Sequence, residues 1–280
     1  MADRFEFILR GVRGTLPMAV PGGTSYGGNT SCVLVRHGAK VAILDAGSGI
    51  VGLGRDLIAE GVEAVDVVIS HAHYDHVIGL PFFLPLYCSD MQVTLWYAGC
   101  PDAPDGRSLL ADLIRAPFLP MGPKDLRCDL HFGVLPTAGS IDLGGGTTLT
   151  TCPVRHPGGS VGMRIGRGAG DLVYVPDFEH DDGPMDAQLV GLMQGAEVAL
   201  LDCTYLPEDY PQNAGYGHSH WRKCASLAAR AGVRRMGMFH HNFSRTDEAI
   251  AAAEADARQD DPAIFAARES MVLRPEDDKP

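Results

Sequence analysis

The feature that most constrains this chain is the run HAHYDH, residues 71–76, which directly follows the apolar run VDVVIS. A short valine-rich run of this kind predicts a buried β-strand. The histidines and Asp75 then emerge from a strand end into a loop, where side chains carried by a rigid sheet can converge. Imidazole nitrogens and carboxylate oxygens with no cysteine nearby suit Zn, Mn or Fe. The spacing therefore predicts a metal site rather than satisfied surface histidines.

Further apolar runs of strand length form two blocks along the chain. The first block comprises 5–9, 32–35, 41–44, 65–69 and 93–97, and the second comprises 147–152, 161–165, 172–175, 198–201 and 235–239. Helical periodicity or composition predicts helices at 50–59, 221–231 and 246–258. Two blocks of strands, each followed by helices, predict two packed sheets with helices outside.

Neither block reads as an independent unit, so we expect one domain over residues 1–273. The segment 100–128 contains five prolines and little periodicity, which favours a surface loop or a lid over the site. The charged, proline-containing tail 274–280 is expected to be frayed.

The formal net charge of −12 disfavours a long nucleic acid as partner, because such binding draws on a basic surface. A site crowded with aspartates could raise the acidity while holding cations, so a nuclease is disfavoured without being excluded. No apolar run is long enough to span a membrane, and the N-terminus is charged, so we expect a cytoplasmic protein without a membrane partner. Seven scattered cysteines without a CxxC pair indicate core residues rather than disulfides.

Several motifs resemble one known family. HAHYDH resembles the HxHxDH signature of the metallo-β-lactamase superfamily, and GVRGTLP, YGGNTSC and LDAGSG resemble the opening of its ribonuclease Z-like and cyclic-phosphodiesterase-like branch. RHPGGSVGMRI, YVPDFEH, LLDCTY, GHSH and MFHHNFSR resemble the later motifs of that branch. The resemblance spans nearly the whole chain. It implies an α+β fold, the αββα sandwich of two mixed β-sheets with helices on the outer faces.

The resemblance also implies two divalent metal ions per chain, Zn or Mn, with Fe as a further option. The implied ligands are His71, His73 and His156 for one ion, Asp75, His76 and a C-terminal histidine for the other, and Asp177 for both. The last ligand is open between His240 and His241. We favour His240, because it directly follows the apolar run RRMGMF.

Two such metals suit hydrolysis, because they can lower the pKa of water and clamp the anionic oxygens of a substrate. Asp75 counts as catalytic because it holds the second ion. His218 in GHSH and Asp202 in LLDCTY are candidates for protonating the leaving group, with a solvated loop histidine and a turn aspartate as the alternative. Asn29 and Thr30 could present amides to the substrate, although Gly-Gly-Asn is foremost a turn signal.

The pair of His218 and Asp202 favours a phosphodiester, and the expected substrate is a small cyclic or linear one. Ribonuclease Z relatives that mature tRNA carry an arm between the positions of His156 and Asp177, and only twenty residues separate them in this chain. A tRNA 3′-processing nuclease, a lactonase or thioesterase, and a non-catalytic metal-binding sensor are the alternatives. The sequence leaves a homo-oligomer open.

Overall fold

The computed structural model describes residues 5–19, 24–166 and 170–274. Its strands are β1 (Phe5–Gly11), β2 (Cys32–His37), β3 (Lys40–Leu44), β4 (Ala64–Ile69), β5 (Gln92–Tyr97), β6 (Asp129–Val134), β7 (Gly139–Gly144), β8 (Thr147–Val154), β9 (Ser160–Gly166), β10 (Leu172–Val175), β11 (Val198–Asp202), β12 (Arg235–Phe239), β13 (Ile264–Ala266) and β14 (Val272–Leu273). Its α-helices are α1 (Gly49–Ala59), α2 (Tyr74–Val77), α3 (Gly106–Leu113), α4 (Pro184–Met193), α5 (Tyr210–Asn213), α6 (Trp221–Ala231) and α7 (Asp247–Asp260). Residues 275–280 of the expected frayed tail lie outside the described residues.

The strands form two mixed sheets of seven strands each. The first has the order β14-β1-β2-β3-β4-β5-β6, and the second has the order β13-β12-β11-β10-β9-β8-β7. In the first sheet β3 to β6 run parallel, whereas β1 pairs with β14 and β2, and β2 with β3, in antiparallel fashion. In the second sheet β10 to β13 run parallel and β7 to β10 pair in antiparallel fashion.

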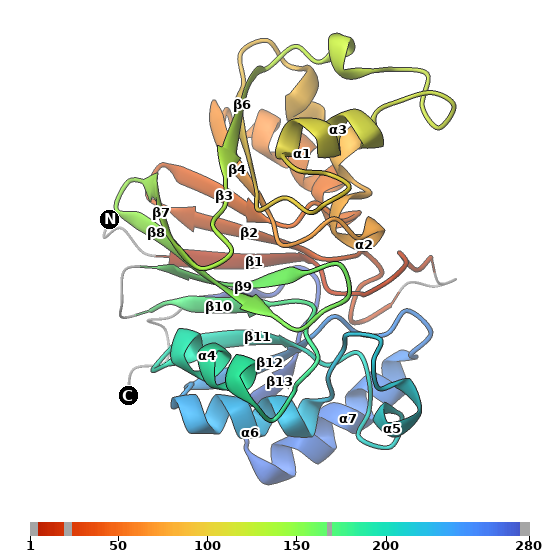
Figure 1. Ribbon diagram of the computed structural model, residues 1–280, viewed down its shortest axis with the longest axis vertical. Coiled ribbons are helices and arrows are strands. Elements are labelled where there is room, and N and C mark those ends of the chain that lie inside the picture. Colours follow the sequence, from red (N-terminus) through yellow and green to blue (C-terminus); the bar gives the residue numbers. More distant parts are fainter. Residues whose placement is uncertain (1–4, 20–23, 167–169, 275–280) are drawn as a thin grey trace.

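The two sheets pack face to face, and helices cover both outer faces (Figure 1). Alternation along each strand sends side chains to opposite faces. In β10, Tyr174 faces the core between the sheets while Val173 and Val175 face the core under α4 and α6. The expected αββα sandwich is therefore confirmed.

The core under α1 shows why that helix forms where it does. Ile50, Leu53 and Leu57 are buried at spacings of three and four residues, and they pack on the outer face of the first sheet. On the other side of the molecule, α6 buries Trp221 and Leu227 and ends at Gly232, whose φ of 66° suits glycine.

Four of the longer elements are not predicted by the sequence: α3, α4, β6 and β7. The helix α3 lies inside segment 100–128, where Asp105 caps it by accepting from Ser108 N. Strand β6 is an edge strand in which Asp129, His131 and Val134 are exposed, so its apolar residues do not form a continuous run. None of the described helices has the length and apolar content that crossing a membrane requires.

Candidate metal centre

The predicted metal ligands meet at one edge of the two sheets. His71 follows β4, His73 precedes the short helix α2, and Asp75 and His76 lie within that helix. The remaining three lie just beyond β8, β10 and β12 of the second sheet; they are His156, Asp177 and His240. Strand ends and one helix turn thus carry side chains that are up to 169 positions apart, from His71 to His240, into one cluster.

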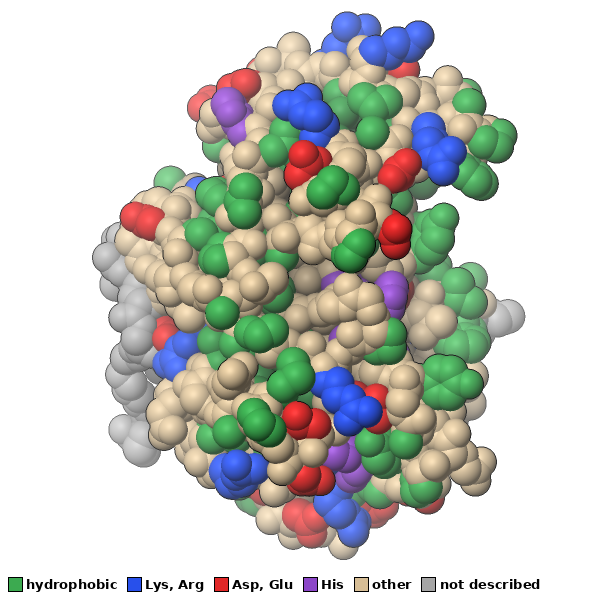
Figure 2. Space-filling model, viewed as in Figure 1, with side chains coloured by type: hydrophobic (Ala, Val, Ile, Leu, Met, Phe, Trp, Pro, Cys, Tyr) green, Lys and Arg blue, Asp and Glu red, His purple; other side chains and the backbone are tan. Residues whose placement is uncertain are grey.

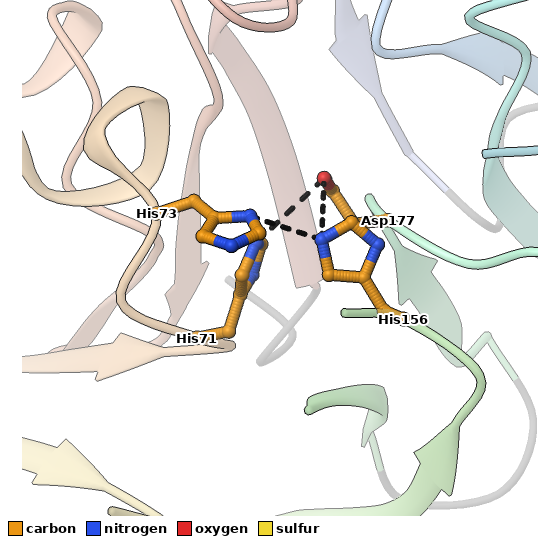
Figure 3. A group of neighbouring side chains, drawn as sticks. All are labelled: His71, His73, His156 and Asp177. Carbon is orange, nitrogen blue, oxygen red and sulfur yellow. Dashed lines mark hydrogen bonds and ion pairs between the residues drawn. The ribbon is translucent and has the colours of Figure 1, made fainter. Parts of the chain in front are cut away.

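One group of four side chains comprises His71, His73, His156 and Asp177, and Figure 3 shows their rings and carboxylate turned toward a common point. His73 Nδ1 and His156 Nε2 are 3.0 Å apart. Asp177 Oδ2 lies 3.6 Å from His156 Nε2 and 3.7 Å from His71 Nε2. Three imidazoles and one carboxylate oxygen at these separations are a donor set that Zn or a similar divalent ion prefers.

A second group comprises Asp75, His76, His240 and the same Asp177. The other carboxylate oxygen, Asp177 Oδ1, lies 2.9 Å from His76 Nε2 and 3.1 Å from His240 Nε2. Asp75 Oδ2 lies 2.9 Å from His240 Nε2 and 3.3 Å from His76 Nε2. The two oxygens of Asp177 therefore face the two groups separately, as a carboxylate shared by two cations would.

Three buried atoms of the cluster make no well-aligned hydrogen bond among the described residues, although two of them, His76 Nε2 and Asp177 Oδ1, are only 2.9 Å apart; the third is His71 Nε2. Buried polar atoms without a partner cost free energy, and native proteins rarely keep them. All three atoms point into the two groups. The donor set therefore fits a pair of divalent metal ions, which would satisfy these atoms.

The ring nitrogens on the far side of the ligands have fixed partners. His76 Nδ1 bonds Asp45 Oδ2 at 2.7 Å, and His156 Nδ1 donates to Gly217 O at 2.8 Å. His240 Nδ1 lies 2.9 Å from Thr204 Oγ1. Such partners select the tautomer and the ring orientation of a metal ligand. Asp45 is assigned no role from the sequence, although a buried aspartate directly after the apolar run 41–44 could have indicated one.

Burial lowers the pKa values of His71, His73 and His156, which keeps these rings in the neutral form that binds metal. Burial also acts to lower the pKa of His76, but the carboxylates of Asp177, Asp75 and Asp45 outweigh it and raise that pKa. The carboxylates around His76 thus favour a positive charge at this position.

Asp202 and His218 form a pair beside the cluster. His218 Nδ1 lies 2.7 Å from Asp202 Oδ2, and the His218 ring is 5.2 Å from the ring of His240 between centroids. Asp202 is fully buried and also accepts from Phe178 N and from Thr204 N and Oγ1. Burial acts to lower the pKa of His218, but Asp202 outweighs it and raises the pKa to about 9.

The structure separates the remaining candidates from this cluster. His241 is buried on the other side of the strand end, where Nε2 donates to Ala267 O, so His240 is the histidine that faces the site. Asn29 N donates to Glu269 and Thr30 N donates to Ser48. The amides of these two residues are therefore engaged within the protein.

Gly14 shows how closely the first loop approaches the site. A Cβ atom at Gly14 would lie 2.3 Å from the His240 ring, which no real side chain tolerates. The next residue, Thr15, donates its backbone N–H to Asp75 Oδ2 at 2.7 Å. The GVRGTLP motif therefore seals one wall of the centre with backbone.

Two cavities open onto the cluster and share Ala72, His73 and Tyr74 as walls. One has a volume of about 440 Å³ and runs between His71 and the segment that carries Leu109, Arg115 and Phe118. The other has a volume of about 800 Å³ and is lined by Thr15 to Pro17, Asp177 and His218. In Figure 2 histidine side chains are visible in a hollow between the part of the molecule that carries α3 and the part that carries α4 and α6.

The family follows from comparison with known proteins. A model of the β-lactamase superfamily domain matches residues 42–241, which include all seven candidate ligands. The chain therefore belongs to the metallo-β-lactamase superfamily, whose members are generally metal-dependent hydrolases.

Among curated relatives, Uncharacterized protein Rv1339 of Mycobacterium tuberculosis is 28% identical over 233 residues, covering 76% of this chain and 75% of that protein. Ribonuclease Z of Bradyrhizobium sp. is 25% identical, covering 89% of this chain and 93% of that protein.

Solved structures agree with the fold. YhfI from Bacillus subtilis, a metallo-β-lactamase fold protein, superposes with a TM-score of 0.74 at 18% identity, covering 97% of this chain and 99% of its own. A diphosphatase from the PhnP family superposes with a TM-score of 0.69 at 18% identity, covering 96% of this chain and 97% of its own. At these identities the likeness concerns the fold alone.

Proposed function

We propose that this protein is a dinuclear metal-dependent phosphodiesterase that acts on a small cyclic or linear phosphodiester. The observation that carries the proposal is the pair of His218 and Asp202 beside the cluster. A lactone or thioester hydrolase has no need of a cationic histidine facing the site, whereas a phosphodiester develops negative charge on phosphate and on its leaving oxygen. The sequence similarity to a ribonuclease Z supports phosphate chemistry.

The proposed ligands of one ion are His71, His73 and His156, those of the other are Asp75, His76 and His240, and Asp177 serves both. Two bound divalent ions, Zn or Mn, would supply a nucleophilic hydroxide at neutral pH and neutralise charge on the phosphate. Asp45, Gly217 and Thr204 hold three of the ligand rings in orientation through their second nitrogens.

His218 is the proposed general acid. Its Nδ1 is engaged by Asp202, so Nε2 is the nitrogen that can donate a proton to the leaving oxygen. Because Asp202 accepts from Phe178 N and Thr204 as well, its carboxylate cannot turn away from His218 without losing those bonds. Asp202 thus orients the ring and favours its cation.

Three features support a small substrate. Segment 100–128 forms a wall of the smaller cavity through Leu109, Arg115 and Phe118, and we propose that it acts as a lid over the substrate. Only twenty residues separate His156 from Asp177, and the described ones include the antiparallel pair of β9 and β10, which argues against an arm for a tRNA. The net charge of −12 likewise disfavours a polyanion.

The test is metal analysis together with turnover of a substrate panel. The panel comprises bis(p-nitrophenyl) phosphate, 2′,3′-cyclic AMP, 3′,5′-cyclic AMP, a 3′-extended tRNA, a lactone and a thioester. We expect two metals per wild-type chain, one in Asp75→Ala, and turnover of diesters alone. Fewer than two metals in the wild type contradicts the dinuclear centre, and trimming of tRNA without turnover of any small diester establishes the nuclease instead.

His218→Ala tests the acid. It should keep both metals and lose about 10²-fold or more in turnover of a diester whose leaving oxygen needs a proton, such as a cyclic nucleotide, the usual contribution of a general acid. His131→Ala, at an exposed histidine on β6, is the matched control. Ester turnover that survives His218→Ala would favour a lactonase or thioesterase.

A further inference from the structure

Glu179 lies two residues beyond the shared ligand Asp177, in the connection between β10 and α4. Glu179 is buried, with only 3% of the residue exposed. Its backbone N–H donates to Arg155 O at 2.7 Å, which ties it to the residue before the ligand His156. A carboxylate so well buried needs hydrogen-bond partners to remain charged.

Among the described residues, all the hydrogen bonds to this carboxylate come from the segment 210–217. Oε1 accepts from Gly215 N at 2.8 Å and from Tyr210 OH at 3.0 Å, and Oε2 accepts from Gly217 N at 3.0 Å. Two backbone N–H groups and one hydroxyl thus all donate to the same carboxylate, so Glu179 holds the loop from α5 to α6 as an acceptor at both of its oxygens.

That loop serves the site at two consecutive residues. The carbonyl of Gly217 accepts from Nδ1 of the ligand His156 at 2.8 Å. The next residue is His218, whose ring meets Asp202. A displacement of the loop would move the partner of a metal ligand and the proton donor together.

The loop cannot hold this shape through its own backbone preferences. Gly215 and Gly217 have φ angles of 97° and 89°, in a region where glycine is free to adopt many other conformations. A Cβ atom at Gly217 would lie 2.4 Å from His156 Nδ1, so no stiffer residue fits there. External hydrogen bonds must supply the rigidity that the glycines lack.

We propose that Glu179 is a positioning residue, which fixes the 215–218 loop so that Gly217 O orients His156 and His218 reaches the leaving oxygen. Because His218 is a proton donor only in the proposed function, that half of the role rests on the proposed function. The orientation of His156 rests on geometry alone.

Glu179→Gln keeps the shape of the side chain but turns one acceptor into a donor facing an N–H or O–H group. Glu197→Gln, which alters a carboxylate paired with Arg234 before β11, is the matched control. In Glu179→Gln we expect faster amide hydrogen exchange in peptides that cover 214–219 and zinc affinity reduced about tenfold or more. The control should match the wild type in both measurements.

At saturating metal, bis(p-nitrophenyl) phosphate and diphenyl phosphate separate positioning from general damage. The p-nitrophenolate leaves without a proton, whereas the more basic phenolate benefits from an acid. We expect kcat for diphenyl phosphate to fall about tenfold or more in Glu179→Gln, while kcat for bis(p-nitrophenyl) phosphate falls less than about threefold.

Unchanged exchange at 214–219 in Glu179→Gln overturns the inference. Faster exchange combined with unchanged zinc affinity and equal losses on both diesters also overturns it, because the loop would then position neither side chain. If the wild type cleaves none of the small diesters, the cyclic nucleotides included, the proposed function fails, while exchange and zinc affinity still decide the orientation of His156. Tyr210→Phe, which removes one donor to Glu179, should show a smaller effect in the same direction and replaces Glu179→Gln if that variant does not fold.

Discussion

Asp45 illustrates how much one side chain can decide at this site. It directly follows β3 with a φ of 60° and is fully buried. Oδ1 accepts from Ser70 N, and Oδ2 accepts from Ser70 Oγ and Tyr174 OH and bonds His76 Nδ1. Ser70 Oγ in turn lies 3.1 Å from His71 Nδ1. One carboxylate therefore holds a ligand of each proposed ion.

Asp45→Asn should lower zinc affinity about 10-fold to 100-fold, because an amide cannot accept all of these bonds and the His76 ring loses its orientation. Competition with a chromophoric chelator measures the affinity. Asp66→Asn is the matched control, since Asp66 is also buried in the first sheet but bonds Trp96. Equal affinities for Asp45→Asn and the wild type would show that Asp45 only supports the fold.

At the scale of elements, two helices carry consequences beyond packing. His220 caps the N-terminus of helix α6, where its Nδ1 accepts from Lys223 N, and the His220 ring contacts Tyr210 and His180. Helix α3 and the residues after it line the smaller cavity. At α6, the capping residue His220 makes the stability of the protein depend on pH. At α3, a surface segment forms part of the wall of a cavity that opens onto the cluster.

Stability should fall as the pH drops below the ordinary histidine range. Burial, His180, Arg222 and Lys223 lower the pKa of His220 to about 4, so the unfolded chain takes up this proton more readily than the folded chain. The contribution is fully present above about pH 6.5 and is lost progressively between 6.5 and 4. Urea unfolding at several pH values measures this effect. Between about pH 6.5 and 4, the free energy of unfolding should fall less steeply with decreasing pH in His220→Asn, which keeps a cap acceptor, than in the wild type.

Phe118→Ala should weaken substrate binding without altering stability. The Phe118 side chain is 68% exposed, lies under Arg115 and lines the cavity beside His71. Loss of an aromatic contact worth about 1 kcal/mol would raise KM for bis(p-nitrophenyl) phosphate about threefold to tenfold with kcat nearly unchanged. Val134→Ala, at a side chain that is 78% exposed on β6, is the control. A lower kcat at constant KM would contradict the lid.

At the scale of the whole molecule, the centre lies across the junction of the two sheets. His71, Asp75 and His76 belong to the first sheet and its helix α2, whereas His156, Asp177 and His240 follow strands of the second. Bound metal would therefore connect the two sheets in addition to the hydrophobic core between them. Metal affinity and global stability are then linked.

Removal of metal with EDTA should lower Tm by about 5–10 °C, the shift expected when ligand binding contributes a few kcal/mol to a protein of this size. Differential scanning calorimetry measures it. Asp177→Ala, which removes the shared ligand, should abolish the shift. Asp202→Asn should retain it, because Asp202 is not a proposed ligand. The same Tm with and without EDTA in the wild type would contradict metal binding.

Local patterns in the sequence determine much of the fold. The apolar runs 65–69 and 198–201 are strands because both faces are buried, and burial on both faces leaves a hydrophobic run that only Asp66 interrupts. Edge strand β6 lacks this signal because half of it faces solvent. Helix α3 gives no clear hydrophobic signal either, because it has only eight residues and is stabilised in part by the cap at Asp105.

The chemistry of the site divides in the same way. HAHYDH determines four candidate ligands by itself, because offsets of a few residues at a strand end place side chains together regardless of the rest of the chain. The choice of His240 over His241 depends on which face the end of β12 presents, and only packing decides that. Asp45 and Glu179 meet partners 25 to 129 residues away, through contacts that exist only once sheets and loops are assembled.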